Sequence, residues 1–443
     1  MLKKLSENDL FKHMTPQYIV EQLNRYVVGQ SSAKKKVSIA LRHRFIRKFV
    51  QGPLRDEITP KNILMMGPTG VGKTEIVRRL ASILDVPFIK VEATKFTEVG
   101  YVGRDVESII RDLADKAVKE QREKSLDQVS ILADEKAKQI ILDKLIDSAD
   151  DHDDKREEFL QKLLNGDFND DEIEIEIAHS IIDVEIMAPP GMEEMTSQIH
   201  SVFQSLGGDR KKKKTMKVVD ALKFLKEEEA SKLLDDDQIK NIALQQIEEQ
   251  GIIFIDEIDK VCQRKSDFST QDVSREGVQR DLLPLIEGCT VATKYGPVKT
   301  DHILFITSGA FHLSKPSDLI PELQGRLPVR VELSPLTVND FILILSATDA
   351  SLIAQYKALL AVENVNLNFS EDGIERIAQI ACEVNERSEN IGARRLHTVM
   401  ERLLEDVFFD VSFNERNVLV DKNFVDAQLS SLLISEDLHQ FIL

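Results

Sequence analysis

The sequence has few cysteines, no long apolar run and no excess of basic residues. Its three cysteines, Cys262, Cys289 and Cys382, are widely spaced and form no C-x-x-C pair, which predicts reduced, buried thiols. No apolar run approaches the roughly 20 residues that a membrane-spanning helix needs, and the first residues lack the apolar stretch of a signal peptide. We therefore expect a cytoplasmic protein with no membrane partner.

The charge balance is acidic. The 443 residues include 76 Asp and Glu against 58 Lys and Arg, a net charge of −18. A generic nucleic-acid binder needs a basic face for phosphate contacts, so this balance speaks against a nucleic-acid partner. The length predicts two to four domains, and the hydrophobic content of 42% is enough to form their cores.

Residues 67–74 read G-P-T-G-V-G-K-T and match the phosphate-binding pattern G-x-x-x-x-G-K-[ST]. Its glycines let backbone N–H groups approach phosphate oxygens, Lys73 supplies a positive charge, and Thr74 offers a hydroxyl to Mg²⁺. The apolar residues 63–66 predict a buried strand before this loop, and residues 75–80 predict a helix after it. A helix N-terminus after a strand is a ready anion site, which favours phosphate binding over a chance glycine-rich turn.

Residues 251–257 read G-I-I-F-I-D-E, a buried strand that ends in two carboxylates. In a nucleotide site, Asp256 would hold Mg²⁺ and Glu257 would polarise the water that attacks the γ-phosphate. The same pair at an isolated strand end would be unremarkable, but together with the phosphate loop it predicts an ATPase that uses ATP and Mg²⁺.

The two motifs lie much farther apart in sequence than one strand–helix unit requires, so we expect an insertion over residues 118–246. Apolar residues at helical spacing predict that it is mostly helical. Residues 172–177 alternate acidic and apolar side chains, as a strand with one acidic face would. The basic run at residues 210–214 fits a solvated linker better than a nucleic-acid contact.

Three later segments add candidate polar groups. Thr307 and Ser308 follow an apolar strand at residues 303–306 and would either cap it or sense the γ-phosphate. Arg326 lies between Gly325 and Pro328, on what we expect to be a tight turn, where it is either a surface charge or an arginine finger that reaches a neighbour's γ-phosphate. Residues 392–396, G-A-R-R-L, open a helix that brings an arginine toward the nucleotide.

These motifs together resemble ring-forming AAA+ ATPases of the Clp/Hsp100 class, and most closely the HslU (ClpY) family, the ATPase partners of the HslV peptidase. The resemblance spans essentially the whole chain. It also rests on residues 14–16, 27–30 (V-V-G-Q), 100–103 (G-Y-V-G), 272–284 and 441–443 (F-I-L). One departure is His439-Gln440, where the family more often has a basic residue at the second position.

The resemblance implies the role of each site residue. Val28 would pack on the adenine, Thr74 and Asp256 would ligate Mg²⁺, and Arg394 would contact ATP bound to its own subunit. Lys73 and Glu257 would be catalytic, together with Arg326 acting on a neighbour's ATP. The other residues implied to bind the nucleotide are Gly70, Val71, Gly72, Glu75 and Glu322.

The resemblance also implies contacts with other proteins. Tyr101 and Val102 would line a central pore and grip protein substrates. Phe441, Ile442 and Leu443 would dock on an HslV-like peptidase, although they could also pack back onto their own or a neighbouring subunit.

The expected fold class is α/β: an AAA+ P-loop NTPase with a doubly wound parallel sheet, an inserted mostly helical domain and a small C-terminal α/β domain. We expect the nucleotide-binding domain at residues 1–117 and 247–333, the insertion at 118–246 and the small domain at 334–443. We expect a homohexameric unfoldase that passes its substrates to a separate peptidase. The sequence shows no Ser-His-Asp or Cys-His arrangement, so proteolysis would belong to the partner. An AAA+ nucleic-acid motor (helicase or clamp loader) and a chaperone without a peptidase remain as alternatives.

Overall fold

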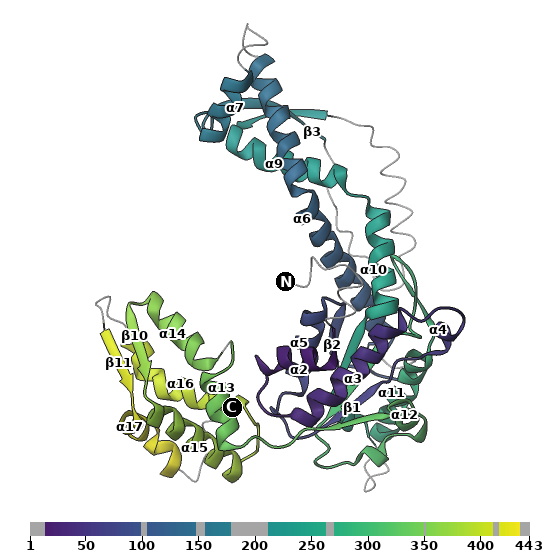
Figure 1. The fold of residues 1–443 in the computed structure, drawn as a ribbon, viewed down its shortest axis with the longest axis vertical. Helices are drawn as coiled ribbons and strands as arrows, with labels where there is room; N and C mark the ends of the chain where they lie inside the picture. Colours follow the sequence, from purple (N-terminus) through teal and green to yellow (C-terminus); the bar gives the residue numbers. More distant parts are fainter. Residues whose placement is uncertain are drawn as a thin grey trace. The chain divides into compact units, whose positions relative to one another are not determined.

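The computed structural model describes residues 14–98, 104–147, 156–178, 211–262, 270–349, 351–410 and 416–434. The chain forms two compact units (Figure 1). One contains residues 1–118 and 242–443, and the other contains residues 119–241, so that the second interrupts the first in sequence.

The first unit is built on a five-stranded parallel sheet with the strand order β2-β5-β8-β1-β9. Its strands are β1 (Ile63–Met66), β2 (Phe88–Glu92), β5 (Ile252–Asp256), β8 (Leu304–Gly309) and β9 (Val329–Glu332). The central strands β5, β8 and β1 each begin with an apolar run, because both faces of a parallel sheet are covered. This arrangement confirms the predicted doubly wound α/β fold.

Alternate residues of each central strand enter different cores. Ile252 and Phe254 pack with the helices α2, α3 and α5, whereas Ile253 and Ile255 pack with the first turns of α6 and with α11 and α12. All four side chains are fully buried. These helices are α2 (Pro16–Asn24), α3 (Ser31–Arg47), α5 (Lys73–Leu84), α6 (Ser108–Asp147), α11 (Thr270–Glu287) and α12 (Pro321–Arg326). The same unit also contains α4 (Leu54–Glu57) and a hairpin of β6 (Thr290–Thr293) and β7 (Gly296–Lys299).

The C-terminal part of the first unit has its own core, in which five helices pack around two parallel strands. Its elements are α13 (Val338–Ser346), α14 (Leu352–Val362), β10 (Val365–Phe369), α15 (Glu371–Arg387), α16 (Arg394–Phe409), β11 (Arg416–Val420) and α17 (Lys422–Ile434). Polar side chains cap the N-termini of several of these helices. Thr337 forms a capping box with Asp340 at the start of α13, and Ser370 caps α15. A separate small α/β domain at residues 334–443 stays a prediction, because these residues belong to the same compact unit as the parallel sheet.

The second unit combines helices with one antiparallel strand pair. It contains α7 (Arg156–Asn165), β3 (Glu172–Ala178), β4 (Lys211–Lys217) and α9 (Val218–Leu233). The long helices α6 and α10 (Asp236–Gln250) contribute residues to both units. Ile173 and Ile175 are buried in its core, as the alternating pattern predicts for a strand with one apolar face.

Two local predictions were wrong. Residues 211–214 of the basic run do not form a linker but begin β4, which pairs with β3 and sets Lys217 opposite Glu172. The opposite charges of this pair favour the register, and the sequence of β4 alone gives no sign of it. Arg326 does not lie on a tight turn but is the last residue of α12, a short helix that begins with proline.

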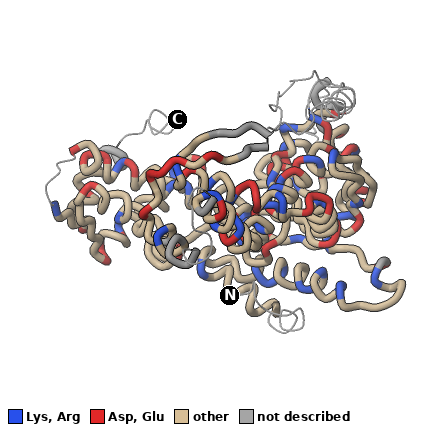
Figure 2. The backbone as a smooth tube through the Cα atoms, turned by 90° about the horizontal axis from the view of Figure 1, so that it is seen from above, with Lys and Arg blue, Asp and Glu red and all other residues tan. Residues whose placement is uncertain are grey.

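Within the described parts of the chain, no helix combines the length and the apolar character needed to cross a membrane. Lys and Arg are interspersed with Asp and Glu over most of these parts (Figure 2), but α3 carries Lys and Arg without Asp or Glu.

Candidate functional site

The carboxyl ends of β1, β5 and β8 meet at one edge of the sheet, where ligands bind in folds of this kind. The phosphate loop follows β1, Asp256 ends β5, and Ser308 lies near the end of β8. A cavity of about 640 Å³ opens at this edge, and we call it the nucleotide cavity. Its lining includes Val28, residues 69–75, Asp256, Glu257 and Arg394, so the structure brings most of the predicted site residues together.

The phosphate loop has the backbone that its glycines permit. Gly67, Gly70 and Gly72 have φ of 144°, 73° and 103°, and Lys73 begins α5. The Lys73 ammonium donates to the carbonyl oxygens of Gly67 at 2.5 Å and Pro68 at 2.8 Å. Burial lowers the pKa of Lys73, and the nearby Asp256 carboxylate opposes that shift. A cation and a helix N-terminus therefore face the same side of the cavity, as phosphate binding requires.

Oxygen donors suited to Mg²⁺ meet beside this loop. Thr74 Oγ1 lies 3.3 Å from Asp256 Oδ2, and the Ser308 hydroxyl donates to Asp256 Oδ1. Hydroxyl and carboxylate oxygens are the ligands that Mg²⁺ accepts, so Thr74 and Asp256 fit the predicted metal-binding role. Thr307, in contrast, is buried and bonds to the Ile63 carbonyl at 3.4 Å. Of the two candidates at the end of β8, it is Ser308 that contacts the acidic group.

Lys90, on the edge strand β2, was not found from the sequence. Its ammonium lies 3.0 Å from Asp256 Oδ2. Burial alone would raise the pKa of Asp256, but the Ser308 hydroxyl and the Lys90 ammonium outweigh burial and hold this pKa below its usual value. Asp256 is therefore kept ionised, as a metal ligand must be.

Glu257 has a left-handed backbone, with φ 58° and ψ 34°, which is uncommon for a residue with a side chain. Its N–H donates to Asp256 Oδ1 at 3.1 Å, and this bond helps to hold the unusual turn. The side chain is exposed and lines the nucleotide cavity. Such backbone conformations concentrate at functional sites, in agreement with a carboxylate presented to solvent and substrate.

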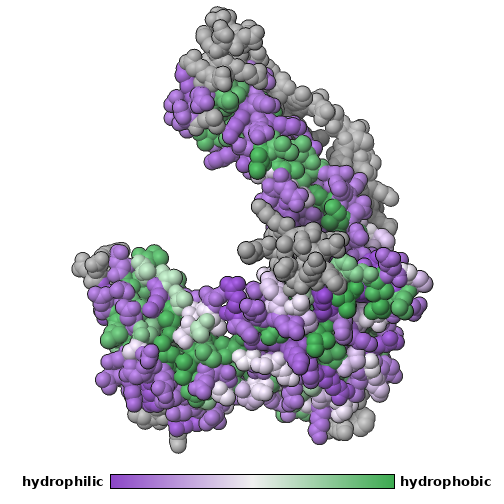
Figure 3. Space-filling view, viewed as in Figure 1, coloured by the Kyte–Doolittle hydropathy of each residue, from purple (hydrophilic) through white to green (hydrophobic). Residues whose placement is uncertain are grey.

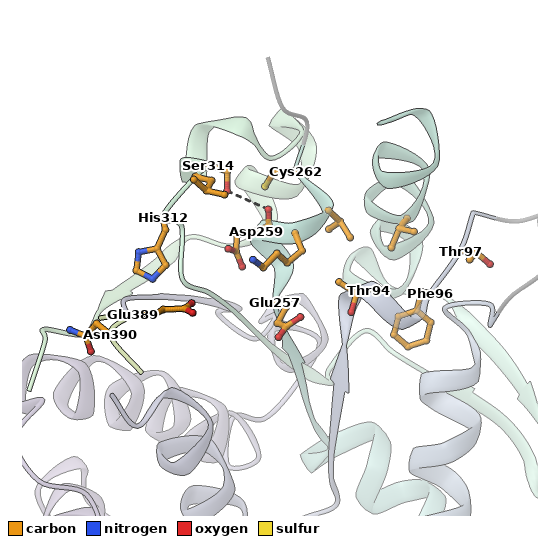
Figure 4. Close-up of a pocket in the computed structure, with 14 residues that line it drawn as sticks. Thr94, Phe96, Thr97, Glu257, Asp259, Cys262, His312, Ser314, Glu389 and Asn390 are labelled. Atoms are coloured by element: carbon orange, nitrogen blue, oxygen red, sulfur yellow. Dashed lines mark hydrogen bonds between the residues drawn. The ribbon is translucent and has the colours of Figure 1, made fainter. Parts of the chain in front are cut away.

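A second cavity of about 900 Å³ adjoins the nucleotide cavity on the Glu257 side (Figure 4). The two share Glu257, Asp259, Lys260, His312 and Glu389. In Figure 4, Glu257 and Asp259 come from the end of β5 and the turn after it, and Ser314 bonds to the Asp259 carbonyl at 3.3 Å. Glu257 therefore lines both cavities.

The opposite end of the nucleotide cavity is apolar. Val27 and Val28 line it together with Leu336, Ile344 and Leu352 from the C-terminal part of the unit. Such a lining suits the flat, apolar faces of a purine base. Val28 therefore lines the cavity, and its contact with adenine stays a prediction.

Glu75 lines the cavity and belongs to a network of charged side chains. It forms ion pairs with Arg78 and Arg79, each at 2.7 Å, and Arg79 stacks on the ring of Tyr26 at 3.8 Å from the ring centre. Burial would raise the pKa of Glu75, but the two guanidinium groups outweigh burial and lower it. Glu75 thereby holds Arg79 at the rim of the cavity.

The C-terminal part contacts the phosphate loop through the backbone. Ala393 N–H donates to the Gly70 carbonyl at 3.0 Å, and Gly392 has φ of 58°. A Cβ atom added to Gly70 would lie 1.9 Å from the Ile391 carbonyl oxygen. The contact therefore requires glycine at position 70.

The two arginines at the start of α16 have different roles. Arg395 is 1% exposed and bonds to Asn385, Ser388 and the Glu389 carbonyl, so it builds the turn before α16. Arg394 is exposed and lines the nucleotide cavity. The structure thus places Arg394, rather than Arg395, where a nucleotide contact is expected.

Other predicted residues lie away from the cavity lining. In the described part of the chain, Glu322 and Arg326 are exposed on α12, and Arg326 pairs with Glu287 at 3.1 Å. Tyr101, Val102, Phe441, Ile442 and Leu443 lie outside the described residues.

Comparison with protein families agrees with this geometry. Residues 63–179 match the family described as ATPase family associated with various cellular activities (AAA), and residues 179–330 match the AAA domain (Cdc48 subfamily). Together the two matches cover residues 63–330, more than half of the chain. The chain belongs to the AAA+ ATPases. For an AAA+ ATPase, the phosphate loop and the end of β5 are the parts that bind and hydrolyse ATP.

The glycine contact gives a direct test of how this AAA+ ATPase holds its phosphate loop. Gly70→Ala places a Cβ against the Ile391 carbonyl, so the turn at residues 391–393 must move and ATP affinity should fall by at least about tenfold. Gly52→Ala is the matched control, because Gly52 also has a positive φ, of 80°, but nothing lies within 4 Å of its added Cβ. Isothermal titration with ATP analogues should separate the two variants. Equal affinities would contradict the importance of this contact.

Proposed function

We propose that this AAA+ ATPase is the unfoldase subunit of a two-component, ATP-dependent cytoplasmic protease, working with an HslV-like peptidase. The observation that carries the proposal is a nucleotide cavity bounded by the parallel sheet and by the C-terminal part of the same unit. ATP and ADP would make different contacts with these two walls. Nucleotide state would therefore change the angle between them and produce mechanical work.

The hydrolytic step follows from the residues at the sheet edge. Lys73 and the N-terminus of α5 hold the β- and γ-phosphates, and Glu257 orients and polarises the attacking water. Mg²⁺, held by Thr74 and Asp256, supplies positive charge to the phosphates. Arg394 approaches from the C-terminal side, so it would respond to loss of the γ-phosphate.

Assembly into a homohexamer would complete the site. Arg326 is 54% exposed on α12, where it could reach the ATP of a neighbouring copy. The second cavity leaves the Glu257 side of the site open to such a group. Apolar side chains are also exposed on the C-terminal part, as Figure 3 shows, among them Leu359, Val362 and Phe409. Large exposed apolar side chains favour an interface.

Tyr101 and Val102 would grip the substrate polypeptide during translocation. The segment that carries them begins and ends at a β-bridge between Phe96 and Arg104, reinforced by a 3.2 Å bond from Thr97 N–H to the Arg104 carbonyl. A loop closed at its base can present an aromatic side chain that grips varied polypeptides. We assign this role to the loop because of the resemblance to the HslU family.

The alternative of a nucleic-acid motor is less well supported. Outside α3, which carries no Asp or Glu, acidic and basic residues are interspersed over the described parts (Figure 2), whereas a nucleic-acid path requires a continuous basic surface. Stimulation of ATP hydrolysis by DNA or RNA would favour the motor over the unfoldase.

Replacing Glu257 separates ATP binding from hydrolysis. Glu257→Gln keeps the shape of the site but removes the carboxylate that polarises water, so hydrolysis should slow by at least about 10²-fold while ATP still binds. Lys73→Thr should instead lose ATP affinity. Steady-state phosphate release and equilibrium binding measure the two effects. Near-normal turnover by Glu257→Gln would rule out its proposed role.

Truncation of the C-terminus tests the peptidase partnership. A chain lacking residues 441–443 should keep its basal ATP hydrolysis and its oligomeric state but fail to activate an HslV-type peptidase. A free peptide of residues 435–443 should partly activate that peptidase. Degradation of a folded, fluorescent substrate gives the readout. Full degradation by the truncated chain would contradict docking through this tail, and loss of basal hydrolysis would indicate that the tail supports the fold instead.

A further inference from the structure

The apolar end of the nucleotide cavity has two walls that come from distant parts of the sequence. One wall is the segment Tyr26-Val27-Val28, which we call the base strap, and the other includes Leu336, in the segment between β9 and α13. Backbone bonds attach each segment on one side, from Val27 N–H to the Leu23 carbonyl and from Leu333 N–H to the Met66 carbonyl. The N-cap residue and the first turn of α3 add side-chain contacts to both segments.

Gln30 binds the second wall with both atoms of its amide. Its Nε2 donates to the Ser334 carbonyl at 2.8 Å, and its Oε1 accepts from the Ser334 N–H at 3.0 Å. Gln30 has a left-handed backbone with φ 54°, and its side chain does not cap α3. A non-glycine residue persists in this conformation where its surroundings dictate it, and the paired bonds to Ser334 are such a constraint.

Lys34 holds the base strap from one turn farther along α3. Its side chain is 2% exposed, and its ammonium donates to the Val27 carbonyl at 2.5 Å and to Asn24 Oδ1 at 2.8 Å. Burial lowers the pKa of Lys34 to about 8, and Asp340 opposes the shift. Lys34 is therefore still mostly protonated at pH 7. A buried lysine is costly, which indicates that its bonds to the strap are important.

We propose that Gln30 and Lys34 are positioning residues that hold the two walls of the base-binding end at a fixed separation and thereby set affinity for the nucleotide base. The proposal rests on ATP binding by this AAA+ ATPase and is independent of the peptidase, the pore loop and the oligomeric state. Neither side chain needs to touch ATP, because Gln30 acts through Ser334 and Lys34 through Val27. Affinity for the phosphates, which bind the loop at residues 67–74, should not depend on them.

Two substitutions test the proposal in the full-length chain. Gln30→Asn keeps an amide and tolerates the left-handed backbone, but its shorter side chain does not reach Ser334. Lys34→Met keeps the apolar stem and removes the donor to Val27. Each variant should bind ATP roughly 3- to 20-fold more weakly, since hydrogen bonds that hold the base end are lost. The turnover number at saturating ATP should stay within about twofold, because the catalytic groups are untouched.

Inorganic tripolyphosphate provides the decisive comparison, because it carries the phosphates of ATP without a base. Its competition against a fluorescent ATP analogue should be unchanged in both variants. Lys36→Met is the matched control: Lys36 lies on the same helix and also donates to a backbone carbonyl, that of Arg330 at 3.0 Å, but it does not contact the base strap. Lys36→Met should bind ATP like the unsubstituted chain.

The possible outcomes distinguish the proposal from its alternatives. Unchanged ATP affinity in Gln30→Asn and Lys34→Met would overturn it, and so would equal losses for ATP and tripolyphosphate, which would indicate general damage to the site. If Gln30→Asn does not fold, Gln30→Glu replaces it, since glutamate has the same length but sets a carboxylate oxygen against the Ser334 carbonyl. Failure of the unsubstituted chain to bind ATP would instead contradict the nucleotide site itself.

Discussion

The whole site depends on parallel pairing of β1, β5 and β8, which brings their carboxyl ends to one edge of the sheet. The phosphate loop, Asp256 and Ser308 come from segments far apart in sequence, and only this pairing makes them neighbours. The pairing is stable because alternate residues of each strand enter two different cores. Burial on both faces fixes the register, since a shift by one residue would exchange the two faces.

A second constraint joins the sheet edge to the C-terminal part. The bond from Ala393 N–H to the Gly70 carbonyl connects the phosphate loop to the start of α16, and the buried pair of Asn385 and Arg395 builds the turn that makes this bond. Two backbones meet directly here, so movement at the phosphate loop reaches α16 without flexible side chains between them. Arg394 is the residue directly after this turn. The buried Arg395 fixes the turn and thereby places Arg394 at the cavity.

The sequence predicts those parts of the site that lie within one short segment. The phosphate loop, the acidic end of β5 and the helix start at Arg394 each carry a local pattern that specifies both a backbone and a chemistry. Lys90, Gln30 and Lys34 could not be assigned in this way. Each acts through a contact that its own segment does not reveal, such as the bond between Gln30 and Ser334, which are 304 positions apart. The strand β4 was missed for the same reason, because its pairing with β3, a strand about 40 residues earlier in the chain, cannot be read from its own segment.

We propose that ATP is hydrolysed at a site shared by two copies of the chain, with Arg326 supplied by the neighbour. ATP turnover by mixed assemblies of Arg326→Ala and Glu257→Gln chains, each inactive alone, tests this arrangement. Some interfaces in such mixtures combine an intact Arg326 with an intact Glu257, so turnover should recover and peak at intermediate mixing ratios. Mixtures that co-assemble but show no more turnover than either parent would contradict a shared site.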